Sequence, residues 1–411
     1  MCVKKNLAGI AKSVSLVVAL TTGLTTVTAV LSPVAMAAAE KQQLSSKMKP
    51  LGEAQKLMAD KKWKEALAVI NEKVVPITGK TAYEETVTNE FKAACLMQLK
   101  DFAGVAKVYE TMLAANQVPA DQVSARTMTL AELYLSVGDF SKAIETYERY
   151  LKTNAPTSDV YLGLTQANFK KQDYKKSAEY AEKLIKLAEQ NKKPVDKTWL
   201  QMLGFSYSKQ GNNEGYADVL AKLLDLYPSA EYWNDMLKIT KNEVNYSDRE
   251  KIEFYRLKKA VGAISEAELN DMAELALALN DAGDAKTALE AEPSSERTNR
   301  LLAKAKADAA QDAATLDAEA AKAATKPDGE ALAKIGAAYL GQGQYDKAAT
   351  TIQAAIAKGG LKAVDESYVR LGVANLNLGK KADAIKSFQS VSDKSKLSRL
   401  AKLWVIYVSK K

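Results

Sequence analysis

Histidine is absent from the 411 residues of this chain. Its absence excludes catalysis by a Ser-His-Asp or Cys-His arrangement, the HExxH chemistry of zinc proteases, and every metal site that needs an imidazole ligand. Catalysis by carboxylates alone is not excluded by composition. We expect no metal site and no cofactor, because no glycine loop of the phosphate-binding type is present either.

Cysteine is almost as scarce, since Cys2 and Cys95 are the only two. Cys2 lies in an N-terminal segment that we expect to be removed, which leaves Cys95 without a partner for an internal disulfide. Cys95 falls in the apolar stretch 93–99. A small core residue is the expectation there, and a redox role is the lesser alternative.

Charge is not concentrated either. The formal net charge is +8, and Lys4, Lys5 and Lys12 lie in the first 37 residues, so a processed chain carries 8 − 3 = +5. No dense run of Lys and Arg with interleaved aromatic residues is present, and we therefore expect no nucleic-acid binding. The 47% of hydrophobic residues is too high for a disordered chain.

Only one long apolar run is present, and it lies at the N-terminus. Lys4 and Lys5 are followed by an apolar stretch over residues 14–31 and then by Ala35-Met36-Ala37, a small-x-small cleavage site. This order predicts a secretory signal peptide over residues 1–37. An uncleaved anchor is the alternative, but five threonines within the run disfavour a permanent span. We expect no transmembrane segment in the processed chain.

A short turn sequence recurs along the rest of the chain. Gln172-Asp173-Tyr174 follows 34 residues after Gly138-Asp139-Phe140, with apolar residues at helical spacing on both sides. A period of this size predicts stacked helical hairpins, a solenoid without a single enclosed core. The other copies are Gly211-Asn212-Asn213, Gly343-Gln344-Tyr345 and Gly379-Lys380-Lys381, with weaker ones at Lys61-Lys62-Trp63, Lys100-Asp101-Phe102 and Gly283-Asp284-Ala285.

The hairpins resemble the tetratricopeptide repeat family. Its consensus has a Trp/Tyr-x2-Leu-Gly-x2-Tyr first helix, a Gly-Asp/Asn-Tyr turn, an Ala-x3-Phe/Tyr second helix and a closing Pro. Residues 127–156 match it with Ala131, Tyr134, Gly138, Ala143 and Tyr147. The chain departs from the consensus at the small position, which is Thr165 in one unit, and at the turn glycine. The resemblance implies an all-α fold of helical hairpins in a right-handed superhelix.

After the signal peptide we expect three parts. Helical repeats occupy residues 38–293, an alanine-rich helical pair or a hinge occupies 294–327, and further repeats with a capping helix occupy 328–411. The last segment places Leu400, Leu403, Trp404 and Tyr407 on one helical face. A capping helix is expected there, and docking on a partner or a membrane surface is the alternative.

The resemblance also implies a concave groove lined by the first helices of the hairpins. Side chains of mixed aromatic, Gln and Lys character suit a peptide better than a small molecule. The alternative is that the aromatic residues pack into adjacent hairpins. The Lys and Asn clamp of chaperone-binding members is missing from these positions. The groove residues carried over are Met128, Glu132, Leu135, Leu162, Gln166, Phe169, Lys170, Gln201, Phe205 and Lys209.

Residues 358–391 and 400–408 are similar to exported tetratricopeptide proteins found with TonB-type energy-transducing systems of Gram-negative bacteria. This resemblance covers the last ~60 residues. It implies a non-catalytic periplasmic scaffold that binds a protein or peptide segment in its groove and assists TonB-dependent transport, with TonB-complex components as partners. The oligomeric state does not follow from the sequence.

Two other functions compete with this interpretation. An envelope-assembly factor for outer-membrane proteins or peptidoglycan enzymes would need the same kind of groove. A peptidoglycan-cleaving enzyme is disfavoured, because the repeats occupy most of residues 51–408 and leave no room for a lysozyme-sized domain. Its candidate carboxylates, Glu84, Glu85 and Glu243, lie on charged stretches where solvated side chains are expected.

Overall fold

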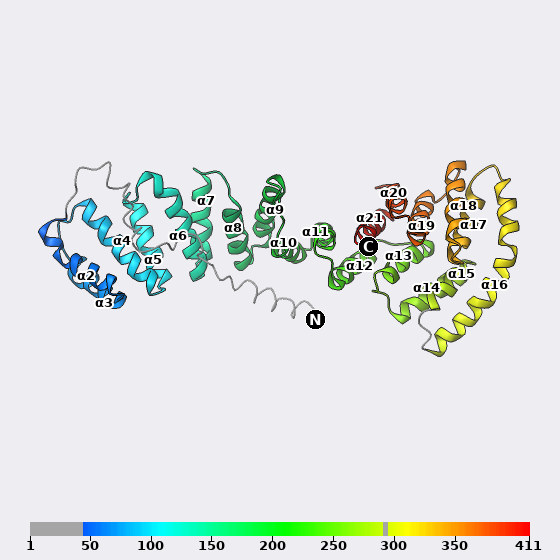
Figure 1. Cartoon of the computed structure of the whole chain (residues 1–411), viewed down its shortest axis with the longest axis horizontal. Helices are drawn as coiled ribbons and strands as arrows, with labels where there is room; N and C mark the ends of the chain where they lie inside the picture. Colours follow the sequence, from blue (N-terminus) through cyan, green and yellow to red (C-terminus); the bar gives the residue numbers. More distant parts are fainter. Residues whose placement is uncertain (1–43, 291–294) are drawn as a thin grey trace. The chain divides into compact units, whose positions relative to one another are not determined.

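The computed structural model describes residues 44–290 and 295–411, so the expected signal peptide lies outside the described residues. All regular elements of the described residues are helical (Figure 1). The all-helical hairpin fold expected from the sequence is confirmed. Among these residues no helix is both long and apolar enough to cross a bilayer.

The chain divides into two compact units, residues 1–210 and 211–411. In the first unit, successive helices pair as hairpins and each hairpin packs on the next (Figure 1). A π-helical segment, Ile70–Val74, continues the second helix. The helices of this unit are α2 (Lys49–Ala59), α3 (Trp63–Val69), α4 (Ala82–Gln98), α5 (Phe102–Ala114), α6 (Val123–Val137), α7 (Phe140–Leu151), α8 (Ser158–Lys170), α9 (Tyr174–Gln190) and α10 (Lys197–Gln210).

The recurring turn has the same construction in each copy. Its first residue has a positive φ and its second residue occupies the N-cap position of the next helix. Gly138 has φ 84°, and the Asp139 carboxylate accepts a hydrogen bond from the Lys142 backbone N–H at 3.1 Å. Gln172 and Lys100 adopt φ 63° and 61° although they are not glycine. The departures from the consensus glycine therefore strain the turn without removing it, at about 1 kcal/mol each.

One copy of the turn lies three residues earlier than the sequence pattern predicted. Asn280 has φ 57° and Asp281 caps α15, while Gly283 and Asp284 are buried inside that helix. The prediction of a turn at Gly283 is wrong. Asn280 tolerates the left-handed conformation and Asp281 supplies the capping carboxylate, so glycine is not needed.

The core of each unit contains a close contact between a glycine and a buried ring. A Cβ atom on Gly163 of α8 would overlap the ring of Tyr147 in α7, the second helix of the preceding hairpin. In the second unit a Cβ atom on Gly372 of α19 would overlap the ring of Phe388 in α20, the second helix of the same hairpin. Each glycine lets a first helix approach an aromatic residue of a second helix, and Gly372 lies at the glycine position of the tetratricopeptide consensus.

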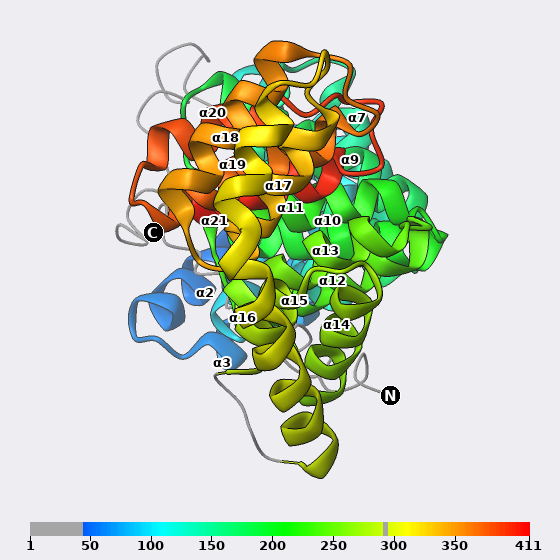
Figure 2. The same ribbon diagram turned by 90° about the vertical axis from the view of Figure 1, so that its right-hand side faces the viewer.

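The second unit contains eleven of the described helices (Figures 1 and 2). They are α11 (Asn213–Leu226), α12 (Ala230–Glu243), α13 (Asp248–Ala260), α14 (Glu266–Ala278), α15 (Ala282–Leu289), α16 (Glu296–Ala324), α17 (Glu330–Gly341), α18 (Tyr345–Lys358), α19 (Val364–Asn377), α20 (Lys381–Gln389) and α21 (Ser398–Ser409).

The alanine-rich stretch forms one continuous helix, α16, of 29 residues, which runs along the front of the view in Figure 2. The helical pair expected there is therefore wrong. The stretch contains neither Gly nor Pro to end a helix, and its alanines favour helix throughout. Leu302 and Leu316 lie on its buried face.

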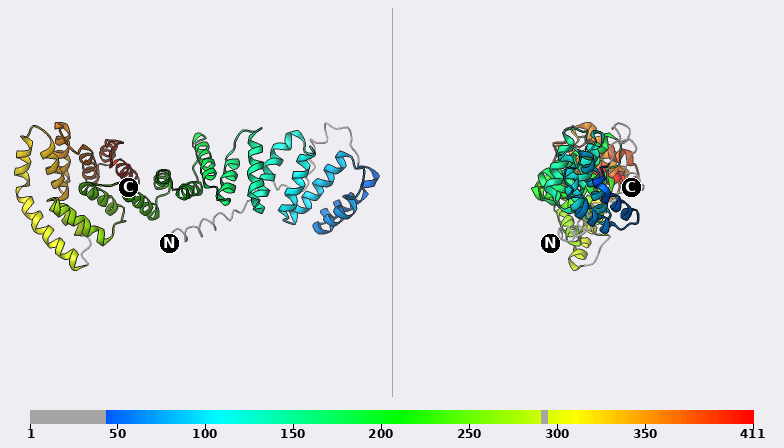
Figure 3. Two further views of the ribbon diagram at one scale, coloured as in Figure 1. Left: turned by 180° about the vertical axis from the view of Figure 1, so that it is seen from behind. Right: turned by 90° about the vertical axis from the view of Figure 1, so that its left-hand side faces the viewer.

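The last helix closes the second unit. Leu400, Leu403 and Trp404 of α21 are buried, and the Trp404 ring stacks on Phe388 with centroids 5.4 Å apart. The same helix contacts α11 and α13, far earlier in the chain (Figure 3). The Tyr407 ring lies 6.5 Å from that of Trp233. These contacts explain why the division falls at 210/211, whereas the sequence analysis placed boundaries at 293/294 and 327/328.

Candidate protein-binding surface

The ten predicted groove residues lie on α6, α8 and α10, the first helices of consecutive hairpins in the first unit. Lys170 and Lys209 are exposed, whereas Gln166 is buried with 8% of its surface accessible. Met128 and Leu135 pack against the buried core of the unit. The other five, Glu132, Leu162, Phe169, Gln201 and Phe205, are partly exposed. The predicted surface is therefore accessible mainly along α8 and α10.

Three aromatic rings meet at the end of this surface. The Phe169 ring of α8 lies 5.2 Å from the Phe205 ring of α10, measured between centroids. Tyr174, the first residue of α9, lies 5.9 Å from Phe169 and 5.7 Å from Phe205. All three are partly exposed. We call Phe169, Tyr174 and Phe205 the aromatic cluster.

The sequence left open whether the aromatic residues line a groove or pack into adjacent hairpins, and features of both are present in the aromatic cluster. Phe169 and Phe205 do pack against each other across adjacent hairpins, and part of each ring still faces solvent. Tyr174 was absent from the predicted groove, because its place in the repeat marks it as a turn residue. The signal that could have identified it is an aromatic residue directly after the cap, four residues beyond a groove lysine.

Exposed lysines contact the aromatic cluster or lie within two residues of it in the sequence. Lys170 and Lys171 end α8, Lys175 lies in the first turn of α9, and Lys209 ends α10. The Lys209 ammonium lies 5.3 Å from the centroid of the Phe205 ring, within the range of a cation–π interaction. Within the described part of the chain, none of these four lysines forms an ion pair. We call them the lysine rim.

The opposite end of the predicted groove is acidic. Burial raises the pKa of Glu132 above its ordinary value, and the nearby charge of Asp159 raises it further. Burial also raises the pKa of the Tyr147 hydroxyl, and both carboxylates add to this shift. The first unit therefore presents carboxylates near α6 and ammonium groups near the α8–α9 turn. Such a surface favours one orientation of a charged partner.

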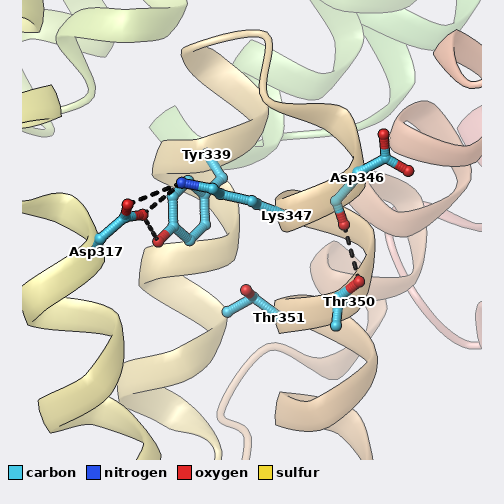
Figure 4. A pocket seen from close by; sticks show the side chains of 6 residues that line it. All are labelled: Asp317, Tyr339, Asp346, Lys347, Thr350 and Thr351. Atoms are coloured by element: carbon cyan, nitrogen blue, oxygen red, sulfur yellow. Dashed lines mark hydrogen bonds and ion pairs between the residues drawn. The ribbon is translucent and has the colours of Figure 1, made fainter.

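An open pocket of about 460 Å³ lies in the second unit and is lined by residues of α16, α17 and α18, which Figure 4 shows. The Asp317 carboxylate accepts hydrogen bonds from the Tyr339 hydroxyl at 2.6 Å and from the Lys347 ammonium at 2.6 and 2.9 Å. Lys347, followed by Tyr339, lowers the pKa of Asp317. The Asp317 carboxylate is thus occupied in joining three helices.

A cluster of charged residues is buried inside the second unit. Glu253 of α13 is fully buried and accepts hydrogen bonds from Arg256 and, at 2.8 Å, from Arg370 of α19. Arg256 also pairs with the buried Asp284 of α15. This cluster joins helices that are 117 residues apart in sequence. It is enclosed by the protein, so its role is structural.

The carboxylates considered for a wall-cleaving enzyme have structural partners. Glu84 is buried, contrary to the expectation of a solvated side chain, and accepts hydrogen bonds from the backbone N–H groups of Ser45 and Thr81 at 2.8 and 2.9 Å. Hydrogen bonds, first from Ser45 and then from Thr81, lower the pKa of Glu84 to about 2. Glu243 pairs with Arg399 at 2.6 Å. A general acid needs a raised pKa, which Glu84 does not have.

Family models of the tetratricopeptide repeat match residues 128–192 and 333–395, and a second model of the same repeat matches 200–230. The chain therefore carries tetratricopeptide repeats in both units, and the first match includes α6 to α9. Repeats of this kind form extended surfaces for binding other proteins. No curated protein sequence matches the chain.

Several solved structures are similar to the chain at low identity. A structure of Naa15/Naa10 bound to HypK-THB shares 17% identity and a TM-score of 0.34, over 85% of this chain and 59% of that one. The chain thus spans less than two thirds of that protein. A tetratricopeptide repeat protein from Parabacteroides merdae shares 12% identity over 80% of this chain and 99% of that one, with a TM-score of 0.30.

The C-terminal part of a repeat protein from Cytophaga hutchinsonii shares 15% identity over 77% of this chain and 98% of that one, with a TM-score of 0.33. Likenesses as loose as these three indicate nothing about function.

Proposed function

We propose that this protein is a non-catalytic periplasmic scaffold that binds a segment of another protein along α8 and α10 of its first unit, and that it assists TonB-dependent transport. The observation that carries the binding surface is the contact of Phe169 with Phe205 from consecutive first helices. Partly exposed rings with a charged rim are the usual composition of a protein-binding hot spot.

The proposed location rests on residues 1–37, whose basic start, apolar run and Ala35-Met36-Ala37 site have the order of a secretory signal. The transport role rests on the similarity of residues 358–391 and 400–408 to exported repeat proteins of TonB-type systems. The role is one of position only: the scaffold holds a component of the system in place and carries out no chemical step.

The first experiment is affinity capture from periplasmic and membrane extract, with mass spectrometry of the bound proteins. Three baits are compared: the chain from residue 38, its Phe169→Ala/Phe205→Ala variant, and a Tyr345→Ala variant. Tyr345 is the matched control, because it occupies in α18 the place that Tyr174 occupies in α9. We expect TonB-complex components with the first and third baits and their loss with the second.

Two other results would change the proposal. Recovery of outer-membrane assembly or wall-synthesis proteins, with the same dependence on Phe169 and Phe205, would keep the scaffold and replace transport by envelope assembly. Equal recovery of every partner by all three baits would overturn the binding surface. Release of muropeptides from purified cell walls that persists through repeated purification would overturn the non-catalytic assignment.

A further inference from the structure

Some of the lysines beside the aromatic cluster lie at positions where a positive charge destabilises the helix. Lys175 and Lys176 lie in the first turn of α9, which contains no acidic residue. The positive end of the helix dipole disfavours cations there, by about 0.3–1 kcal/mol each. Lys176 has Glu179 at 3.5 Å as a partner, but Lys175 has none within the described residues.

Among residues 44–290 and 295–411, no carboxylate forms an ion pair with the lysine rim. Asp173 is the acidic residue between Lys171 and Lys175, and its carboxylate already accepts the backbone N–H of Lys176 at 3.1 Å as the cap of α9. By comparison, Lys142 in the first turn of α7 pairs with Glu110 at 3.1 Å. Lys142 corresponds to Lys176, and each of them has a carboxylate partner. Lys175 stands where the preceding hairpin has Ser141, and it is the lysine without a partner among the described residues.

We propose that the segment bound at the aromatic cluster is an acidic peptide, with a large apolar side chain that covers the rings of Phe169, Tyr174 and Phe205 and with Asp or Glu residues that face the lysine rim. This inference rests on the proposed scaffold function and names the chemistry of its partner. Four unpaired ammonium groups around exposed apolar surface are complementary to carboxylates that flank an apolar residue.

Ring geometry favours a peptide over a nucleic acid. Stacking of bases needs ring faces that are open to solvent. Here the Tyr174 ring meets Phe169 at 79° and Phe205 at 66°, so the rings pack edge to face against one another. The parts of the three rings that remain exposed form an apolar surface. Leucine, phenylalanine or methionine fits such a surface.

The orientation of the peptide follows from the charge at the other end of α8. Glu132 and Asp159 lie near each other there, and their carboxylates repel acidic residues. The acidic part of the peptide therefore lies over the α8–α9 turn. Its continuation toward α6 is neutral or basic.

The test measures binding of three fluorescent peptides of equal length to the purified chain by anisotropy. One peptide has two Phe residues flanked by Asp and Glu, the second has Asn and Gln in place of the acids, and the third has Ala in place of Phe. We expect the first to bind about tenfold more tightly than either of the others, with an affinity that falls as salt is added.

Charge reversal separates the lysine rim from the general charge of the chain. The Lys170→Glu/Lys209→Glu variant removes two rim lysines, and Lys186→Glu/Lys193→Glu makes the same change of charge at exposed positions outside the rim. Circular dichroism verifies folding of both. We expect about a tenfold loss of affinity for the acidic peptide in the first variant and no change in the second.

Each remaining outcome overturns the inference in a distinguishable way. Equal binding of the acidic and the Asn/Gln peptides would remove the acidic partner and leave the scaffold intact. Equal losses of peptide affinity in both charge variants would show that binding depends on the net charge of the chain and not on the lysine rim. Binding of anionic lipid vesicles or single-stranded DNA, with loss in the rim variant and no peptide binding, would replace the peptide with a polyanion. If the acidic peptide failed to bind while the chain still captured its partners, the inference would be overturned and the proposed function would stand.

Discussion

Single residues that allow close helix approach account for much of the packing in both units. Gly163 faces Tyr147 in the first unit, and Gly372 faces Phe388 in the second, with no space for a Cβ atom at either glycine. Small-to-large changes in such a site force side chains out of their preferred rotamers. The same substitution elsewhere in a helix is expected to have the opposite sign.

We expect Gly163→Ala to lower the free energy of unfolding by about 1–3 kcal/mol, because the new methyl group overlaps the buried Tyr147 ring. Gly52→Ala is the matched control. Gly52 lies within α2 and has no atom near its missing Cβ, so we expect a gain of about 0.5–1 kcal/mol from helix propensity. Urea unfolding measures both. Stabilisation by both substitutions would contradict the close contact.

Buried charge makes the second unit sensitive to pH. Burial and the neighbouring Asp284 carboxylate raise the pKa of Asp281 well above its ordinary value. Burial also acts to raise the pKa of Asp284, but the Arg256 guanidinium outweighs it and lowers that pKa. Folding therefore favours a proton on Asp281. This proton stabilises the fold below the ordinary Asp pKa of about 3.9, and the contribution is lost as the pH rises from there through the folded-state pKa.

Asp281→Asn mimics the protonated side chain and keeps the oxygen that caps α15. We therefore expect a higher midpoint of thermal unfolding than the parent chain at pH 7 and an equal one near pH 4. Asp284→Asn removes one of the two carboxylate partners of the buried Arg256 and should destabilise the chain at pH 7 by about 3–5 kcal/mol. Circular dichroism melting at the two pH values tests both. Destabilisation by Asp281→Asn at pH 7 would show that Asp281 is ionised in the folded chain.

At the scale of the helix, second helices differ in whether a side chain caps their N-terminus. Three second helices of the first unit, α5, α7 and α9, have Asp101, Asp139 and Asp173 as N-caps, and each carboxylate accepts a backbone N–H of the first turn. In the second unit α18 and α20 start at Gln344 and Lys380, which make no side-chain cap. The backbone at Lys380, with φ −81° and ψ 66°, nevertheless matches that at Asp139, with φ −81° and ψ 70°.

Lys380→Asp should therefore stabilise the second unit. The new carboxylate would accept a first-turn N–H and would also interact favourably with the helix dipole, for a gain of about 0.5–2 kcal/mol. Lys386→Asp makes the same charge change in the last turn of α20, where it opposes the dipole, and should be destabilising. Thermal melts of the two variants should shift in opposite directions, and shifts in the same direction would refute the capping argument.

At the scale of the whole molecule, each unit depends on its own contacts. Trp404 is buried in α21, which contacts α20 and also α11 and α13. Trp404→Ala leaves a cavity that lowers the free energy of unfolding by about 3–5 kcal/mol. The cost should be confined to the unit that contains it.

Hydrogen exchange read by mass spectrometry tests this directly. We expect Trp404→Ala to lose amide protection in α11 to α13 and in α19 to α21, with residues 44–210 unchanged. Tyr147→Ala, which leaves a cavity in the first unit, should give the reverse pattern. If Trp404→Ala left α11 to α13 protected and affected only residues 328–411, the boundaries expected from the sequence would describe the chain better than the division at 210/211.

The sequence by itself determined the features that depend on neighbours in the chain. Turn residues, caps and small residues recur at a fixed interval, so the all-helical hairpin fold and the places of α6 to α10 follow from local pattern. The missed turn at Asn280 and the unbroken α16 are local too. The turn was mispredicted because glycine was given more weight than the capping residue. The single helix was mispredicted because the alanine content was given less weight than the repeat period.

Only the tertiary structure decided what depends on distant residues. The Arg370–Glu253 bond, across 117 residues, and the contact of Tyr407 with Trp233 leave no trace in local spacing. The aromatic cluster is similar, because Phe205 meets Phe169 and Tyr174 only when one hairpin packs on the next. Periodicity states which face of a helix is apolar, but the side chains that meet across two faces are selected by packing.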